Sequence, residues 1–277
     1  MQKRIWLITG ISSGLGKALA HAVMESGDFV IGTFRNQSQV DQFNKEHEGK
    51  GKACYLNLNA IESIEPLISE IVLNYGKIDV LVNNAGVGFI GAIEEASLEE
   101  VRKVFEINFF APLRLSQIVL SHMRREKSGH IVQISSHGGI KAFAGFGIYN
   151  ASKFALEGFS EALEQEAGPL GIKVSLIEPG PFRTKFANKG LMEASHVIDD
   201  YSATAGAFRS MLKGVDGKQE GDPEKAAKAI LDLVNSENPS LRLPLGKTAV
   251  KTIGMKLESV KNDLESNKEV AGNSVFE

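Results

Sequence analysis

Two residues in the middle of the chain have the types and spacing of a proton-transfer pair. Tyr149 and Lys153 lie four residues apart at the start of residues 150–167, whose periodicity predicts an amphipathic helix. Residues at this spacing share one helix face, so the ammonium group would lie beside the phenol. A neighbouring cation lowers the pKa of a tyrosine from its ordinary value of about 10, which would suit proton exchange with a substrate oxygen. An ordinary surface pair is the alternative.

A glycine-rich turn near the N-terminus has the composition of a phosphate-binding loop. Gly10, Gly14 and Gly16 follow an apolar segment at residues 4–9 and open a predicted helix. Glycines let the backbone bend tightly and approach a ligand, and a helix N-terminus presents free N–H groups to a phosphate. A tight turn with a purely structural role would look the same, but its place at the start of an alternating chain favours dinucleotide binding.

The end of the second predicted strand bears on the choice of dinucleotide. A protein that prefers NAD usually has an acidic residue there for the ribose 2′-hydroxyl, and this chain has Phe34 followed by Arg35. A guanidinium can bind a 2′-phosphate through its planar set of donors, so the segment favours NADP(H) over NAD(H). A solvated surface arginine is the alternative.

Strands and helices alternate along most of the chain. Continuous apolar segments predict buried strands, and amphipathic segments predict helices that cover them. Strands are expected at residues 4–9, 29–34, 53–58, 80–83, 130–135, 174–178 and 241–243, and helices at 14–26, 37–45, 64–75, 97–105, 110–126, 150–167 and 223–236. This pattern predicts a three-layer, doubly wound, Rossmann-like α/β fold with a mostly parallel seven-stranded sheet.

Two segments interrupt the alternation. Residues 182–221 have weak periodicity but many apolar side chains, and we expect a substrate lid there, within one domain spanning residues 1–246. Packing of these side chains onto the core is the alternative. Residues 247–277 form an extension in which apolar residues recur from Val250 to Leu264, so we expect an amphipathic helix that gives way to irregular structure over residues 266–277.

Five motifs, in this order, resemble the short-chain dehydrogenase/reductase family of the NADP-preferring type. They are TGISSGLG in the glycine turn, VNNAG at residues 82–86, ISS at 134–136, YNASK at 149–153 and EPGPFRT at 178–184. They fall at the carboxyl ends of successive predicted strands, where ligands bind in open α/β sheets. The resemblance runs from about residue 3 to residue 245.

The resemblance implies the residues of a site. The implied catalytic set is Asn108, Ser136, Tyr149 and Lys153. In this set Ser136 holds the substrate oxygen, Tyr149 is proton donor or acceptor, Lys153 also bonds the nicotinamide ribose, and Asn108 anchors a water. Besides Tyr149 and Lys153, the implied cofactor-binding residues are Gly10, Ser12, Ser13, Leu15, Gly16, Arg35, Asn57, Leu58, Asn84, Ala85, Gly86, Pro179, Gly180, Phe182 and Thr184. Asn57 departs from the family, which usually has an aspartate there.

Together these patterns predict an NAD(P)H-dependent oxidoreductase that interconverts a ketone or aldehyde and an alcohol on an apolar substrate. A non-catalytic NADP(H)-binding regulatory or scaffold protein is the alternative, and hydrolase or epimerase chemistry on the same fold is a third. His137 stands beside Ser136, but the Gly-x-Ser-x-Gly elbow of a hydrolase is missing. The other histidines lack metal-ligand spacing, so no metal is expected.

Charge and composition bear on partners. The net charge is −3 and no run of about 18 apolar residues occurs, so neither nucleic acid nor a membrane is expected as a partner. Cys54 is the one cysteine, which fits a reducing cytoplasm. The resemblance implies a homodimer or homotetramer that pairs through the helices expected at residues 110–126 and 150–167.

Overall fold

A sheet of seven parallel strands forms the centre of the molecule. The computed structural model describes residues 3–215 and 217–276. Residues 1–2 of the predicted domain, residue 216 of the predicted lid and residue 277 of the predicted extension lie outside the described residues. The strand order is β3-β2-β1-β4-β6-β7-β9, and every neighbouring pair is parallel. The strands are β1 (Ile5–Ile8), β2 (Phe29–Phe34), β3 (Gly51–Tyr55), β4 (Val80–Asn83), β6 (Gly129–Ile134), β7 (Ile172–Pro179) and β9 (Arg242–Leu245). The predicted fold class is therefore confirmed.

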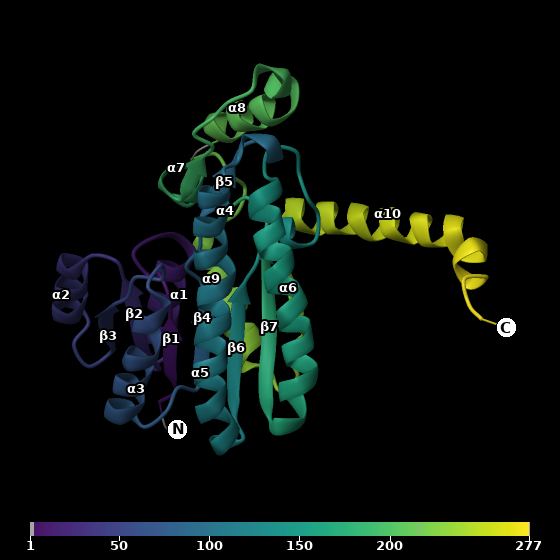
Figure 1. Ribbon diagram of the computed structural model, residues 1–277. Coiled ribbons are helices and arrows are strands. Elements are labelled where there is room, and N and C mark those ends of the chain that lie inside the picture. The colour runs from purple at the N-terminus through teal and green to yellow at the C-terminus, as the bar shows by residue number, and fades with distance from the viewer. Residues whose placement is uncertain (1–2, 216, 277) are drawn as a thin grey trace.

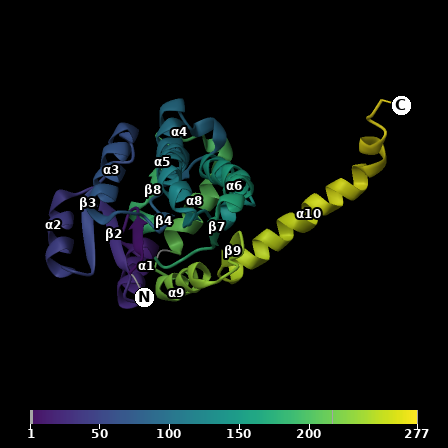
Figure 2. The same cartoon turned by 90° about the horizontal axis from the view of Figure 1, so that it is seen from below.

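Helices cover both faces of this sheet (Figures 1 and 2). One layer holds α1 (Gly14–Glu25), α2 (Gln37–Glu46) and α9 (Pro223–Asn235), and the other holds α3 (Ile64–Tyr75), α5 (Ala111–Glu126) and α6 (Gly147–Ala167). Successive side chains of a strand point to opposite faces. Accordingly, Trp6 and Ile8 of β1 join the core beneath α1 and α9, while Leu7 joins the core beneath α3 and α5.

The helices predicted at residues 97–105 and 110–126 are parts of one continuous helix. α4 (Leu98–Phe105) runs through a π-helical turn, Glu106–Phe110, directly into α5. A π-turn admits one extra residue and is common at functional sites. It turns Asn108 into the interior, where the residue is fully buried.

The predicted loop at residues 182–221 contains secondary structure. It holds α7 (Phe186–Lys189), β8 (Leu191–Glu193), a 3₁₀ helix (Asp199–Tyr201), a π-helix (Ser202–Gly206) and α8 (Ala207–Gly214). β8 pairs in parallel with β5 (Gly88–Ile90) to form a second, two-stranded sheet above the carboxyl edge of the main one (Figure 1). Strands of three residues are too short to show periodicity in a sequence, so both were missed. Short 3₁₀ helices lie at Ile61–Ser63, Ile93–Glu95, His137–Gly139 and Gly168–Leu170.

The C-terminal extension is one long helix, α10 (Lys247–Gly272). Its first turns contact β9 and the 3₁₀ helix at His137–Gly139. The rest of α10 projects away from the body (Figures 1 and 2). The prediction of irregular structure from residue 266 was wrong, because the helix continues to Gly272. Within the described residues, no helix combines the length and the apolar character needed to cross a bilayer.

Candidate active site

The glycine turn lies where the strand order reverses, between β1 and β4. Gly10 and Gly14 have φ angles of 71° and 59°, which residues with a Cβ rarely adopt. Asn84 closes the turn from the β4 side, because its Nδ2 donates to the carbonyls of Thr9 (2.8 Å) and Gly10 (3.0 Å). The Thr9 hydroxyl in turn accepts from the backbone N–H groups of Asn84 and Ala85, each at 3.0 Å. Thr9 was not among the predicted residues, because its partners lie 75 positions away.

The start of α1 is shaped to receive an anion. The N-cap residue Ser13 makes no side-chain hydrogen bond to the first turn of the helix. The free N–H groups at a helix N-terminus attract phosphate. Thr184 lies against this turn, since a Cβ built on Gly14 would be 3.1 Å from the Thr184 Cβ. The residues present therefore fit a dinucleotide pyrophosphate between the glycine turn and the segment after β7.

Arg35 is exposed at the end of β2 and lines a cavity of about 570 Å³. Phe34, which stands at the expected acidic position, points instead into the core, where it is 7% exposed and packs 5.7 Å from Phe43. Arg102 of α4 lines the same cavity as Arg35. Arg102 was missed because it follows Arg35 by 67 positions on another element, with no local signal.

Two residues predicted at the end of the third strand lie beyond it. β3 ends at Tyr55, and Asn57 caps the following turn by accepting from Asn59 N and Nδ2, both at 3.2 Å. Leu58 is buried in the core. Any contact of Leu58 with a cofactor would therefore involve its backbone.

The segment after β7 is fixed to β9 and to the residues that precede α9. Gly180 N donates to Leu245 O at 2.9 Å, and Phe182 forms a bridge with Gly221. Thr184 accepts from Phe186 N through its hydroxyl at 3.2 Å. These contacts hold the predicted nicotinamide segment, which begins at Pro179, along the carboxyl edge of the sheet.

The predicted proton-transfer residues converge in the interior. Tyr149 and Lys153 are both buried on α6, and the Lys153 Nζ lies 6.0 Å from the centroid of the Tyr149 ring. The Nζ donates to Ile134 O at 2.8 Å, and Ser136 follows two residues after Ile134. The alternative of a surface pair is therefore wrong.

The expected direction of the Tyr149 shift is not found in this structure. Burial raises the pKa of Tyr149 to about 12, opposed by hydrogen bonding with Ser136. Burial also lowers the pKa of Lys153 to about 8, opposed by the Glu157 carboxylate. Burial is the largest cause of both shifts, and the phenol keeps its proton at neutral pH, as a tyrosine of ordinary pKa also does.

Asn108 links three elements through its side chain. Its Oδ1 accepts from Val87 N at 2.9 Å, and its Nδ2 donates to Val87 O at 2.8 Å and Ser152 Oγ at 3.0 Å. Both donors of the side-chain amide are thus engaged by protein groups, and Oδ1 accepts one of the two hydrogen bonds it can take. A water held by Asn108 would bind the second acceptor site of Oδ1 or the backbone carbonyl. A Cβ at Gly86 would lie 3.2 Å from the Asn108 Oδ1, which shows how closely the VNNAG segment approaches.

Comparison with known proteins agrees with this arrangement. The family model for short chain dehydrogenase matches residues 4–193. The chain belongs to the short-chain dehydrogenase family. A 3-ketodihydrosphingosine reductase of Bacteroides thetaiotaomicron is 39% identical over 89% of each chain. Retinol dehydrogenase 8 of Homo sapiens is 35% identical over 86% of this chain and 80% of its own. A crystal structure of a short-chain dehydrogenase from Streptomyces avermitilis, 38% identical, superposes with a TM-score of 0.92 over 99% of each chain.

The tyrosine predicted to be catalytic in this short-chain dehydrogenase, Tyr149, faces a wall of aromatic side chains. The centroid of the Tyr149 ring lies 4.4 Å from that of Phe146 and 5.8 Å from that of Phe186. The ring of Phe208 packs against Phe146 in a tilted arrangement, with 5.3 Å between the centroids. Phe186 and Phe208 belong to the predicted lid, as do Leu191, Met192 and Leu212 in the same apolar cluster. These side chains pack on the core around Tyr149, as the alternative interpretation held, and they also form the surface nearest the phenol.

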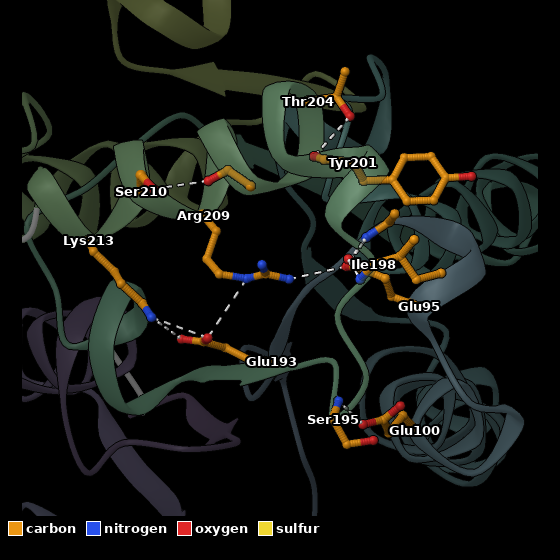
Figure 3. A network of polar contacts seen from close by, with 12 residues as sticks. Glu95, Glu100, Glu193, Ser195, Ile198, Tyr201, Thr204, Arg209, Ser210 and Lys213 are labelled. Atoms are coloured by element: carbon orange, nitrogen blue, oxygen red, sulfur yellow. Dashed lines mark hydrogen bonds and ion pairs between the residues drawn. The ribbon is translucent and has the colours of Figure 1, made fainter.

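A buried carboxylate ties residues 191–214 of the predicted lid to the body (Figure 3). Glu95 Oε2 accepts from Arg209 Nη2 at 3.1 Å and from Ala92 N at 2.8 Å, while Oε1 accepts from Ile198 N at 2.9 Å. Burial would raise the pKa of Glu95, but these hydrogen bonds and the Arg209 charge together hold it below its ordinary value. Glu193 in β8 approaches the same arginine, with its Oε2 3.9 Å from Arg209 Nε.

A second buried acid lies near Glu157, the carboxylate that influences Lys153. Glu178 of β7 is 1% exposed, and within the described residues neither of its oxygens accepts a hydrogen bond. Arg242 Nε lies 3.3 Å from Glu178 and 3.2 Å from Glu157. Burial, helped by the Glu157 carboxylate and opposed by Arg242, raises the pKa of Glu178 to about 7. The folded protein therefore holds a proton that the unfolded chain releases near pH 4.5.

We expect Glu178→Gln to stabilise the protein increasingly as pH rises from about 4.5 to about 7, with the full effect above 7. Because the folded pKa is raised, the stability from Glu178 is full below about pH 4.5 and is lost as pH rises through about 7. The variant removes this loss, worth at most about 3 kcal/mol for a rise from 4.5 to about 7, or roughly 5–8 °C in Tm at pH 8. Thermal unfolding from pH 4.5 to 8 checks this. Glu161→Gln, which removes an exposed partner of Arg242, is the control and should give no such rise.

Proposed function

We propose that this short-chain dehydrogenase is an NADP(H)-dependent reductase of ketones or aldehydes carried on apolar molecules. The observation that carries the proposal is the burial of Ser136, Tyr149 and Lys153 together beside the aromatic wall, at the sheet edge that holds the glycine turn. Burying three polar groups of this kind costs free energy of folding. A catalytic role accounts for their burial at one place.

The chain's own groups account for the proton side of the reaction. The cofactor, when bound, supplies hydride to the carbonyl carbon. Ser136 donates a hydrogen bond to the carbonyl oxygen, and Tyr149 gives that oxygen its proton. The phenol carries this proton at neutral pH, since burial raises the pKa of Tyr149 from an ordinary value of about 10 to about 12. Lys153 holds the cofactor ribose and its positive charge offsets the phenolate left behind.

The substrate class follows from the wall around Tyr149. Phe146, Phe186 and Phe208 offer apolar surface to a substrate next to the reacting oxygen. One relative is named a reductase of 3-ketodihydrosphingosine, and another is named a dehydrogenase of retinol. Both compounds are long and apolar. We infer that the substrate is a lipid-like ketone or aldehyde whose chain lies beneath the lid.

Oxidation of NADPH, followed with a graded panel of carbonyl compounds, tests the proposal. The panel runs from acetaldehyde to 3-ketodihydrosphingosine and retinal. We expect kcat/KM to rise with the length of the apolar chain. Tight binding of NADPH with no turnover across the panel would favour the regulatory or scaffold alternative instead.

The preference for NADP(H) is assigned to Arg35. A guanidinium facing the 2′-phosphate is worth about 1.5–3 kcal/mol, so kcat/KM should favour NADPH over NADH roughly ten- to a hundredfold. Arg35→Asp should abolish or invert this ratio, because an acid repels the phosphate and can accept from a ribose hydroxyl. The ratio is measured by steady-state kinetics with both cofactors.

Arg102→Ala is the companion variant, since Arg102 shares the cavity with Arg35. We expect a smaller loss of the same preference. A wild-type protein that uses NADH more efficiently than NADPH would contradict the assignment.

A further inference from the structure

Most of α10 stands free of the body and exposes a row of apolar side chains. Thr252 Oγ1, which lies 2.9 Å from His137 Nδ1, marks the last turn with a hydrogen-bonded contact to the body among the described residues. Beyond it Leu257 is 63% exposed, Val260 47% and Leu264 63%. A single helix gains little stability in water without packing, so a projecting helix of 26 residues needs a partner.

The spacing of this row is that of a coiled-coil seam. The intervals alternate between three and four residues, which keeps the side chains on one narrow stripe. The seam consists of Val250, Ile253, Leu257, Val260 and Leu264. Asn267 and Ala271 continue the same intervals. Met255 is also exposed but lies off the stripe, on the opposite side of the helix.

The charges around the seam favour a helix over a lipid surface as the partner. Helices that lie on membranes have a wide apolar face bordered mainly by basic residues. α10 has a narrow stripe, and its other positions mix five lysines with four acids over residues 247–272. Mixed charges beside an a/d seam are typical of helix pairs in solution.

We propose that α10 pairs with the α10 of a second copy of this chain, in antiparallel orientation. The body is attached at the start of α10 (Figure 2), so antiparallel pairing places the two bodies at opposite ends of the helix pair, whereas parallel pairing places them side by side. In the pairing that centres the seam, Leu257 lies against the partner subunit's Val260. Ile253 then lies against the partner subunit's Leu264.

Charge complementarity selects this register. Lys256 and Asp263 flank the seam on the same side. In the centred antiparallel register Lys256 faces the partner subunit's Asp263, and the contact occurs twice by symmetry. A shift of one heptad in either direction brings Lys256 against the partner subunit's Lys256, or Asp263 against the partner subunit's Asp263. Parallel pairing brings Lys256 against the partner subunit's Lys261 but Asp263 against the partner subunit's Lys268, so the charges select the register and the placement of the two bodies selects the orientation.

The subunit number of the full chain, measured by sedimentation or light scattering at micromolar concentration, tests the seam. Leu257→Glu places an unpaired charge in the seam and should weaken the association roughly a hundredfold or more, halving the subunit number. This halving is expected whether or not the α5 and α6 helices form another interface. Met255→Glu is the matched control and should leave the subunit number unchanged. NADPH binding by both variants shows that the body remains folded.

A charge exchange tests the orientation. Lys256→Asp should weaken the association, and Lys256→Asp combined with Asp263→Lys should restore it. Strengthening by Lys256→Asp alone would indicate parallel pairing and overturn the proposed orientation. Equal subunit numbers for the wild type and Leu257→Glu would overturn the pairing itself. In that case, loss of binding to anionic lipid vesicles by Leu257→Glu would identify the seam as a membrane-binding face.

Discussion

Tyr149→Phe should lower kcat for carbonyl reduction by about 10²- to 10⁴-fold, the range that general acid catalysis contributes. The substitution removes only the phenolic oxygen, which is the group that gives the proton to the substrate in the proposed reaction. The aromatic contacts with Phe146 and Phe186 remain, so folding and NADPH binding should be unchanged. Steady-state kinetics and fluorescence titration with NADPH separate the two effects.

Tyr201→Phe is the matched control for this substitution. The Tyr201 hydroxyl donates to Glu94 at 2.6 Å at the exposed end of the lid, away from the phenol of Tyr149. We expect its turnover to stay within about twofold of the wild type, as for a surface change. A Tyr149→Phe enzyme that keeps more than a tenth of the wild-type kcat would show that another group supplies the proton.

Glu95→Ala should release the lid from the body. The variant leaves Arg209 without its buried partner and removes the acceptor for Ile198 N, and breaking a buried ion pair costs about 3–5 kcal/mol. Limited proteolysis within residues 191–214 should accelerate by a hundredfold or more, because cleavage follows the population of the open state. KM for an apolar carbonyl substrate should rise in parallel, since the lid supplies Phe186 and Phe208 to the wall.

The control is Glu99→Ala, which removes an exposed carboxylate that pairs with Lys103 in α4. Its proteolysis should match that of the wild type. Acid should mimic Glu95→Ala, because a carboxyl with a lowered folded pKa loses its contribution as pH falls below the ordinary value near 4.5. Equal cleavage rates for Glu95→Ala and the wild type would show that the apolar contacts alone hold the lid.

The sequence by itself determined the fold class, the strands of the main sheet, and the place of the glycine turn and of the Tyr149–Lys153 pair. These features depend on local signals: apolar runs for buried strands, helical periodicity, glycines at a tight turn, and a spacing of four on one helix. Each of these signals can be recognised within a stretch of about 20 residues. The same signals predicted α10 from Val250, Leu257 and Leu264, although not its full length.

Only the tertiary structure decided how these parts interact. Glu95 meets Arg209 across 114 positions, and Arg102 reaches the cavity of Arg35, although no local pattern marks either contact. Packing also reversed the expected pKa shift of Tyr149, because the sequence shows the neighbouring cation but not the burial that raises the pKa. Desolvation and long-range contacts depend on which surfaces the folded chain brings together, and a spacing along the chain cannot contain that information.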